Sequence, residues 1–303
     1  MQNLKKLHPN NIHNTKYNLA ELAKVSSGLE KYIKIGNNSN STIDFDNPKA
    51  LIELNKALLL KYYGLTSWEL PDGHLCPAIP GRANYIHYLN DLIEENKSTD
   101  NSSKKVIKVL DIGTGAGCIY PILGHAIYGW KFVATDISSN AINSCKKVIR
   151  ENGHLKKFIG LRFQKSKDDI FKSIIKSDEF FEATMCNPPF YSSLEEADEK
   201  SNKKKNNLSK KSGGNINHNN LRTFGGYENE LWCEGGELSF IKLMIEQSTS
   251  LQRNCRWFTT LVSSKENLIL LKEILTKTSI TDLRIIKMET SNKISHILAW
   301  SFI

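Results

Sequence analysis

The stretch "CNPPF" at positions 186–190 holds residue types that could do chemistry. Asn187 ends an apolar run and is followed by Pro188, Pro189 and Phe190. Each proline removes a backbone donor and fixes φ, so the run stops in a short, stiff turn. Such a turn could simply terminate a strand, and an Asn-Pro pair by itself favours that interpretation.

The same turn also suits chemistry on the exocyclic amine of a nucleobase. That amine is a poor nucleophile because its lone pair is delocalised into the ring. The side-chain oxygen of Asn187 and the carbonyl of Pro188 could accept its two hydrogens and direct the lone pair toward a methyl donor. This would be catalysis by positioning and electrostatics, and Phe190 could stack on the base.

A glycine-rich segment upstream, "DIGTGAG", predicts a site where a ligand approaches the backbone closely. Gly113, Gly115 and Gly117 follow an apolar run and precede a helical pattern, which is the switch point where open α/β sheets bind ligands. A nicotinamide-binding chain is the obvious rival. Its motif would require glycine at 118, where this chain has Cys118.

Two carboxylates accompany this segment. Asp111 would lie at the mouth of its strand, where it would repel a pyrophosphate and favour the ammonium and sulfonium of S-adenosylmethionine. Asp136 ends the next apolar run, at roughly the spacing that dinucleotide-binding folds use for a ribose contact. Asp136 could instead cap the following helix, although Ser138 could do that equally well.

The elements that must position these residues are alternating strands and helices. Apolar, β-rich runs occur at 106–112, 131–137, 159–164, 181–187, 256–263, 283–289 and 295–303, with helical spacing between most of them, including 168–177. This alternation predicts an α/β fold with a largely parallel sheet covered on both faces. The last two strands have a short link and should pair antiparallel. Seven strands ending in this way are the plan of the Rossmann-like class I methyltransferases.

The first part of the chain is organised differently. We expect a helical N-terminal extension over 1–100, contributing to the cofactor and RNA sites, and the methyltransferase domain over 101–303. Within the extension, a helix is predicted within 43–64, with Asp46 or Asn47 as its cap and Pro48 in its first turn, and a second helix over 83–95. A proline- and glycine-rich loop at 70–82 lies between them.

Charge and composition narrow the class of partner. The net charge is +9, and the segment 200–222 contributes seven positive charges and no acid, including Lys203, Lys204, Lys205, Lys210 and Lys211. A mobile basic loop beside the turn at Asn187 predicts a polyanion partner, although such a loop could also serve only solubility. The six cysteines are scattered and no metal motif is present, so no metal is expected. No secretory or spanning segment is found, so we expect a cytoplasmic protein. We also expect a monomer.

Longer motifs give a more specific resemblance. "LHPNNIH", "CPAIPGRANYIHYL", "DIGTGAGCIYPILG", "MCNPPF" and "NELWCEGGE" together resemble the bacterial 23S ribosomal RNA (adenine(1618)-N(6))-methyltransferases and the related eukaryotic enzyme that methylates adenine in U6 small nuclear RNA. The resemblance runs over nearly the whole chain. It implies an enzyme that uses S-adenosylmethionine to make N6-methyladenine in 23S ribosomal RNA.

The resemblance also implies roles for single residues. Arg82 would hold the methionine carboxylate, Asp136 the ribose, and Ser166 would lie near the cofactor's adenine. Gly113 and the backbone after it, from Thr114 onward, would lie against the cofactor, and Asn187 would be the catalytic contact.

Some alternatives stay open. Glu234 and Glu237 could line the active site, or Glu237 could occupy a helix start, where its charge is favoured. The related "NPPY" motif belongs to enzymes that methylate a glutamine amide in release factors, which the basic segment disfavours. A nicotinamide oxidoreductase and an RNA-binding module without catalysis are the remaining rivals.

Overall fold

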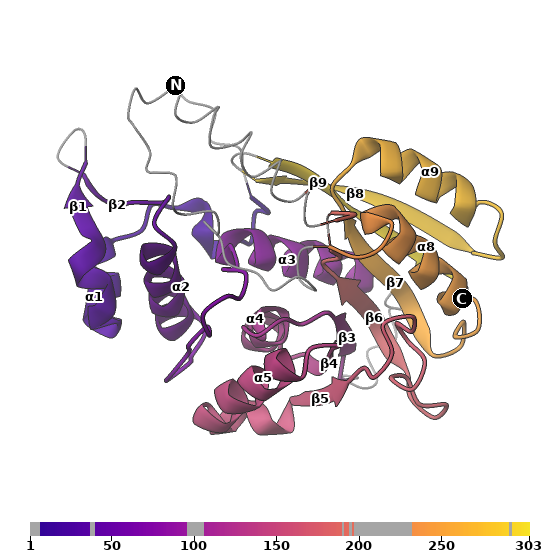
Figure 1. Ribbon diagram of the computed structural model, residues 1–303, viewed down its shortest axis with the longest axis horizontal. Helices are drawn as coiled ribbons and strands as arrows, with labels where there is room; N and C mark the ends of the chain where they lie inside the picture. Colours follow the sequence, from indigo (N-terminus) through magenta and orange to yellow (C-terminus); the bar gives the residue numbers. More distant parts are fainter. Residues whose placement is uncertain are drawn as a thin grey trace.

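A seven-stranded sheet forms the centre of the molecule, in the strand order β5-β4-β3-β6-β7-β9-β8 (Figure 1). The computed structural model describes residues 7–36, 40–95, 106–189, 191–193, 196, 232–290 and 293–303. The strands are β3 (Lys108–Ile112), β4 (Lys131–Asp136), β5 (Ile159–Phe163), β6 (Phe181–Cys186), β7 (Cys255–Val262), β8 (Asp282–Thr290) and β9 (Lys293–Ser301). Strands β3 to β7 pair in parallel and β9 is antiparallel to β7 and β8, which confirms the predicted fold class.

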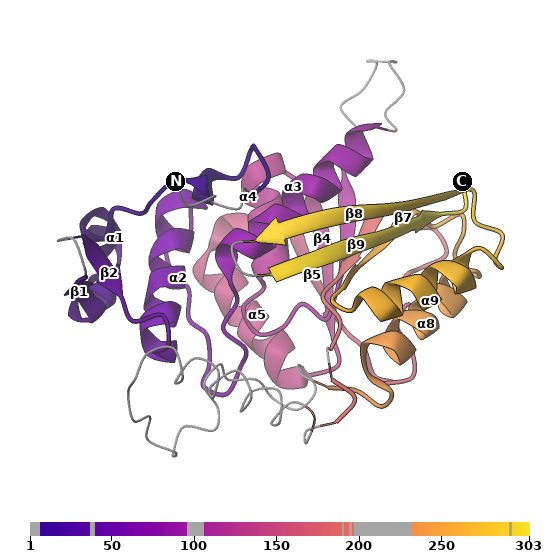
Figure 2. The same ribbon diagram turned by 90° about the horizontal axis from the view of Figure 1, so that it is seen from above.

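Helices cover both faces of this sheet. They are α3 (Ile79–Glu95), α4 (Ile119–Tyr128), α5 (Ser139–Glu151), α8 (Gly236–Ser248) and α9 (Lys265–Leu275). Figure 2 shows α8 and α9 together beside β7 and β9, with α3, α4 and α5 elsewhere around the sheet. Apolar side chains cover both faces of the sheet, as expected where helices pack on either side of a largely parallel sheet.

The alternation of side chains along β9 explains how one strand serves two layers. Ile297 and Ala299 belong to the core cluster that includes α3, α4 and α5, whereas Leu298 and Trp300 belong to the cluster that includes α8 and α9. All four are 0% exposed. Successive side chains of a strand point to opposite faces, so the apolar run "ILAW" predicts burial on both sides.

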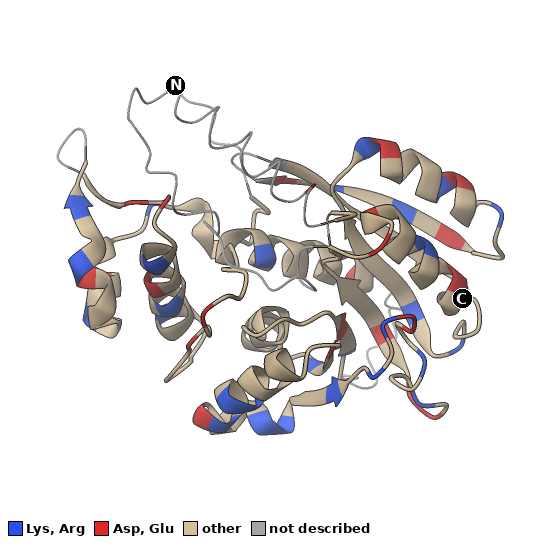
Figure 3. Cartoon of the chain, viewed as in Figure 1, with Lys and Arg blue, Asp and Glu red and all other residues tan. Residues whose placement is uncertain are grey.

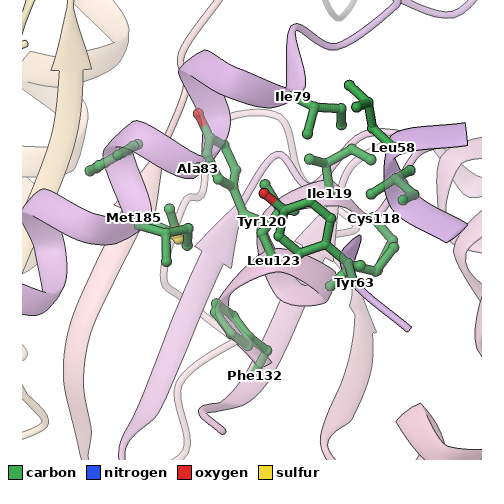
Figure 4. Close-up of a cluster of buried hydrophobic side chains, with 14 of the residues drawn as sticks. Leu58, Tyr63, Ile79, Ala83, Cys118, Ile119, Tyr120, Leu123, Phe132 and Met185 are labelled. Carbon is green, nitrogen blue, oxygen red and sulfur yellow. The ribbon is translucent and has the colours of Figure 1, made fainter. Parts of the chain in front are cut away.

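The N-terminal segment packs against the same core. It comprises η1 (Ile12–Asn14), α1 (Leu19–Val25), η2 (Ser27–Tyr32), β1 (Ile33–Ile35), β2 (Ser41–Ile43) and α2 (Pro48–Tyr62). Figure 4 shows Leu58 of α2 and Ile79 of α3 among side chains of α4, with Phe132 of β4 below them. The boundary predicted at residue 100 lies in 96–105, outside the described residues.

Helix α2 begins as the sequence predicts. The Asn47 side chain accepts hydrogen bonds from the backbone N–H groups of Lys49 (3.0 Å) and Ala50 (3.3 Å), and Pro48 occupies the first turn. Both features satisfy or remove donors that a helix N-terminus leaves unpaired. The two-stranded β1–β2 sheet, in contrast, was not predicted.

Two sequence predictions were wrong, one on the start of α3 and one on the segment 168–177. Helix α3 begins at Ile79 and not at 83, so Arg82 lies in its first turn and not in a loop. The helix predicted over 168–177 is a series of turns, in which Ser173 has a left-handed φ of 63°. The side chain of Gln247 accepts hydrogen bonds from the N–H groups of Ile170 (2.8 Å) and Phe171 (3.2 Å), which holds this segment in its non-helical path.

Asn152 joins the N-terminal segment to the end of α5. It is 1% exposed, its amide donates to the carbonyls of Ser67 (2.8 Å) and Val148 (2.8 Å), and its oxygen accepts from the Thr66 N–H (2.7 Å). Asn152→Ala would leave backbone groups of the 66–67 segment unpaired. We expect it to lower the free energy of unfolding by about 2–4 kcal/mol, measured by denaturant titration.

Asn143→Ala is the matched control, because Asn143 lies on the exposed face of α5. Its effect should stay within about 0.5 kcal/mol. Equal stabilities for the two variants would contradict the role given to Asn152.

Candidate active site

A cavity of about 560 Å³ opens at the carboxyl ends of β3, β4 and β6. The structure brings most of the predicted site residues together there. Its lining includes Arg82, Gly113, Thr114, Gly115, Gly117, Asp136, Asn187, Pro188 and Pro189. Open α/β sheets bind ligands at this edge, so the strand order places the glycine loop, Asp136 and the turn at Asn187 in one hollow, and α3 adds Arg82.

The glycine loop between β3 and α4 is held from both sides. Gly113 and Gly115 have φ values of 69° and 66°, which side chains rarely adopt, and a Cβ at Gly113 would meet no atom within 4 Å. The Thr114 N–H donates to the Thr135 carbonyl (2.9 Å), and the Trp68 indole donates to the Gly117 carbonyl (3.0 Å). The backbone surface facing the cavity is therefore fixed before any ligand arrives.

Asp136 sits at the end of β4 and organises this loop. Its two oxygens accept hydrogen bonds from the N–H groups of Gly115 (2.9 Å) and Ser138 (2.8 Å). The cap of α5 is Ser138, whose hydroxyl accepts from the Ala141 N–H (3.2 Å). Asp136 also lines the cavity, and because a carboxylate can accept about four hydrogen bonds, hydroxyl groups of a ligand can be accepted at this point.

Asp111 lies deeper than the sequence suggests. It is 0% exposed and is absent from the cavity lining, so its carboxylate sits behind the wall and not at the mouth. Neither of its oxygens has a hydrogen-bond partner within the described residues. Burial raises the pKa of Asp111 to about 7, and the nearby Asp136 acts in the same direction.

Two neighbours oppose that shift. The Thr114 hydroxyl lowers the pKa of Asp111, although it forms no hydrogen bond of good geometry, and the Arg82 charge lowers it further. An unpaired buried carboxylate is costly and calls for a compensating cation. A ligand with an ammonium and a sulfonium supplies positive charge to this end of the cavity, so the residues present fit S-adenosylmethionine.

Arg82 and Asn187 meet directly at the side of the cavity. The Arg82 guanidinium donates to the Asn187 amide oxygen (3.3 Å) and to the Tyr120 hydroxyl (3.2 Å), and it lies over the Tyr120 ring at 5.5 Å. Burial raises the pKa of Tyr120 to about 12, so its hydroxyl stays neutral. A cation in this position can receive a ligand carboxylate while it remains beside the turn at Asn187.

Several predicted residues are not placed in the cavity. The Ser166 hydroxyl accepts from the Asp168 N–H (3.2 Å) in a turn, whereas Gln164 and Lys167 on either side of it line the cavity. Ser166 itself is not in the lining. Phe190 and the lysines Lys203, Lys204, Lys205, Lys210 and Lys211 lie outside the described residues.

The two glutamates of "WCEGGE" have different surroundings. Glu237 is 3% exposed, lies in the first turn of α8 and accepts hydrogen bonds from the N–H of Ser263 (2.7 Å) and the side chain of Asn267 (2.9 Å). It therefore ties α8 to the segment after β7, which agrees with the helix-start interpretation. Glu234 lines the cavity.

Sequence reasoning missed Tyr120 and Trp232. Both line the cavity, and the buried indole nitrogen of Trp232 has no hydrogen-bond partner within the described residues. Trp232 forms an isolated parallel β-bridge with Tyr191, which lies just after the turn at Asn187. The Cys233 N–H donates to the Tyr191 carbonyl (3.1 Å). The motifs "CIYPILG" and "NELWCEGGE" contain these residues, but no spacing rule singles them out.

No helix in the described parts of the chain is long and apolar enough to cross a membrane. No group of three or more His, Cys, Asp or Glu side chains within these parts is placed to hold a metal ion.

Comparison with known proteins agrees with this geometry. Residues 1–303 match the model of a family described as RNA methyltransferase. A protein of Colwellia psychrerythraea named ribosomal RNA large subunit methyltransferase F is 46% identical over 98% of this chain and 99% of its own length. A protein of Bacteroides fragilis with the same name is 45% identical, over 98% of each chain.

Solved structures show the same fold. The hMettl16 catalytic domain in complex with MAT2A 3′UTR hairpin 1 has a TM-score of 0.80 and 29% identity, covering 99% of this chain and 96% of that one. The N-terminal domain of human METTL16 in complex with SAH has a TM-score of 0.76 and 28% identity, covering 98% and 99%. These matches confirm the family resemblance and the S-adenosylmethionine cofactor expected from the sequence.

Asp111 should make stability and cofactor affinity respond to pH in opposite ways. Its pKa of about 7 in the folded protein lies above the unfolded value of about 4. The folded state therefore holds the proton between these values, and stability falls as pH rises through that window. We therefore compare the free energies of unfolding of Asp111→Asn and the wild type. The difference in favour of the variant should be about 2–3 kcal/mol larger at pH 8 than at pH 5.

Cofactor binding should move the other way. Ionised Asp111 favours the cationic ligand, so wild-type affinity should rise from pH 5.5 to 7.5, with a proton released on binding. Calorimetry in buffers of different ionisation enthalpy would count that proton, and Asp111→Asn should release fewer. Identical pH profiles for the two proteins would remove Asp111 from the cofactor's environment.

Proposed function

The chain belongs to the RNA methyltransferase family, and we propose that it methylates N6 of adenine 1618 in the 23S RNA of the large ribosomal subunit. The named relatives at 45–46% identity support a large-subunit ribosomal RNA as the substrate. The motif from Asn187 to Pro189 at the cavity supports an exocyclic amine as the acceptor. A ribosomal RNA substrate would place the enzyme in the cytoplasm.

The single observation that carries the choice of amine is the Asn187 amide at the wall of the cavity. Its oxygen is an acceptor with two lone pairs, of which the Arg82 guanidinium uses one. The other can accept a hydrogen of an incoming amine. The prolines at 188 and 189 contribute carbonyl acceptors and no donors, so the wall of the turn is complementary to an –NH₂ group.

The remaining contacts divide the cofactor among three residues. When bound, S-adenosylmethionine supplies an electrophilic methyl group on a sulfonium. We assign its methionine carboxylate to Arg82, its ribose hydroxyls to Asp136 and the field that favours its positive charges to Asp111. Gly113, which lines the same cavity, keeps the backbone open for close approach.

The chain then promotes transfer by orientation. Asn187 and the Pro188 carbonyl hold the two amine hydrogens, so the nitrogen lone pair is turned toward the methyl group. Both acceptors favour the positive charge that develops on the amine during attack. The amine proton becomes acidic once the nitrogen is alkylated, so water suffices to remove it and no strong base is required.

Arg82 links the two halves of this site. One guanidinium touches the Asn187 oxygen and is assigned to the cofactor carboxylate, so cofactor binding and orientation of the catalytic amide are coupled. The stacked Tyr120 ring limits the positions that Arg82 can occupy.

Methyl transfer to RNA tests the proposed function directly. The protein is incubated with labelled S-adenosylmethionine and unmodified 23S RNA, and nuclease fragments are mapped by mass. One methyl group on the fragment containing adenine 1618, as N6-methyladenine, is the expected result. Label on another base or on a ribose hydroxyl would overturn the assignment.

Asn187→Ala should lower the rate of transfer by about 10²–10³ because it removes one preorganised acceptor. Affinity for S-adenosylhomocysteine, measured by calorimetry, should change by no more than a few-fold. Near-normal turnover in this variant would show that Asn187 does not orient the amine.

Arg82→Ala should affect both binding and turnover. We expect weaker binding of S-adenosylmethionine and S-adenosylhomocysteine, which share the carboxylate, and a lower kcat at saturating cofactor because Asn187 loses its partner. Combining it with Asn187→Ala should lower kcat by less than the product of the single effects.

Tyr120→Phe is the control, because it keeps the ring under Arg82 and removes only the hydroxyl. Its effect should be small. If Arg82→Ala raised KM with kcat unchanged, the guanidinium would serve binding alone.

A further inference from the structure

A second hollow, of about 440 Å³, lies on the surface at the far end of α5 and β5. Its rim carries three cations, Lys146 and Arg150 on α5 and Lys156 in η4 (Gly153–Lys157). Its floor is apolar, formed by Ile149, Ile159 and Leu161. Figure 3 shows basic residues gathered on α5 and the turn after it.

These three cations have no ion pair with any described residue. Among the described residues, the one polar contact of these three side chains is a 3.4 Å hydrogen bond from Lys146 to the exposed Asn143. Lys147, one residue further along α5, is different. Its ammonium lies 2.6 Å from Glu69 and 3.9 Å from Glu151, so its charge is already compensated.

The spacing of the cations follows from local structure. Lys146 and Arg150 are four residues apart and therefore lie on one face of α5, above the turn that carries Lys156. Like charges held this close repel one another unless an anion lies between them. An apolar floor under a positive rim suits a ligand with phosphates at its edge and a flat apolar face, which is the chemistry of a polynucleotide.

The hollow is connected to the active site by one strand. Ile159 and Leu161 of β5 line the hollow, and Gln164, directly after β5, lines the reaction cavity. Gln164 follows Ile159 by five residues and Leu161 by three, which corresponds to roughly 10–16 Å along the strand, so the two sites face different parts of one extended substrate. Strand β5 is at the end of the sheet order, which leaves this edge accessible.

We propose that this hollow is a second RNA-binding surface, which holds backbone phosphates of nucleotides that flank the methylated base. It would act by positioning a long RNA and would not contact the reacting atoms. The proposal rests on RNA as the substrate class and not on which base is methylated. It also differs from the basic segment 200–222, which lies outside the described residues.

The test uses a triple variant, Lys146→Ser, Arg150→Ser and Lys156→Ser, in the full chain. Binding is measured by fluorescence anisotropy against salt concentration, with a full-length 23S transcript and with a short hairpin carrying the target adenine. For the long RNA we expect weaker binding and a slope of log K against log[salt] that is shallower by about 2 to 3. Binding of the short hairpin and of S-adenosylhomocysteine should be unchanged.

Lys147→Ser is the matched control, since it removes one lysine from the same helix whose charge is already paired. It should leave binding of both RNAs unchanged. The proposal would be overturned if the triple variant bound the long RNA with the affinity and salt slope of the wild type. An acidic protein or solvent would then be the neighbour of this face.

Two further outcomes are also decisive. Equal loss of binding to the short hairpin would overturn the proposal, because the hollow would then act through general charge and not through flanking nucleotides. Failure of the wild type to methylate adenine 1618 would count against the proposed function alone, since the binding comparison does not depend on catalysis.

Discussion

The placement of α3 is the constraint on which the active site depends. One face of this helix carries Arg82, whose guanidinium reaches Asn187 at the end of β6, and the next turn carries Tyr85, whose hydroxyl lies 2.7 Å from Thr259 of β7. Thr259 in turn donates to the Thr184 carbonyl of β6 at 2.6 Å. The bonds that link Tyr85 to Thr259 and Thr259 to Thr184 are buried, so they are strong and costly to break. Without α3, the turn at Asn187 would lose its cation, and Thr259 would lose the buried hydrogen bond to Tyr85.

Asp111 shows how stability is exchanged for affinity at the same site. The Asp111 carboxyl has a pKa of about 7, whereas an ordinary aspartate is fully ionised at neutral pH. It has no hydrogen-bond partner in the described residues. Perturbed groups of this kind are typical of functional sites, where the ligand provides the missing charge. The contrast with Glu237 is informative. Glu237 is also buried, but backbone and side-chain donors satisfy it, so its carboxylate ties α8 to the segment after β7.

Periodicity in the sequence predicts the fold, and motifs predict the site. Both kinds of prediction are correct where neighbouring residues along the chain determine the local structure. Alternating apolar runs located every strand of the large sheet, and the cap at Asn47 marked the start of α2. Prediction was wrong where tertiary contacts override local preference. Gln247 holds 170–171 in turns despite their helical spacing, and α3 begins before Pro80 and Gly81. The depth of Asp111 and the contact between Arg82 and Asn187 depend on how distant elements pack, which spacing along the chain does not encode.

The division between rigid and adaptable parts of the site follows from the same contacts. Reaction geometry must be held within fractions of an ångström, and the structure places Asn187 and the glycine loop on strand ends cross-linked by buried hydrogen bonds. RNA recognition has a different requirement, because phosphate contacts tolerate side-chain motion and act over longer distances. Long, solvated side chains such as Lys146 and Arg150 meet that need without burial. Strand β5 can therefore serve both requirements. Its first residues line the basic hollow, and Gln164, directly after its last residue, lines the reaction cavity.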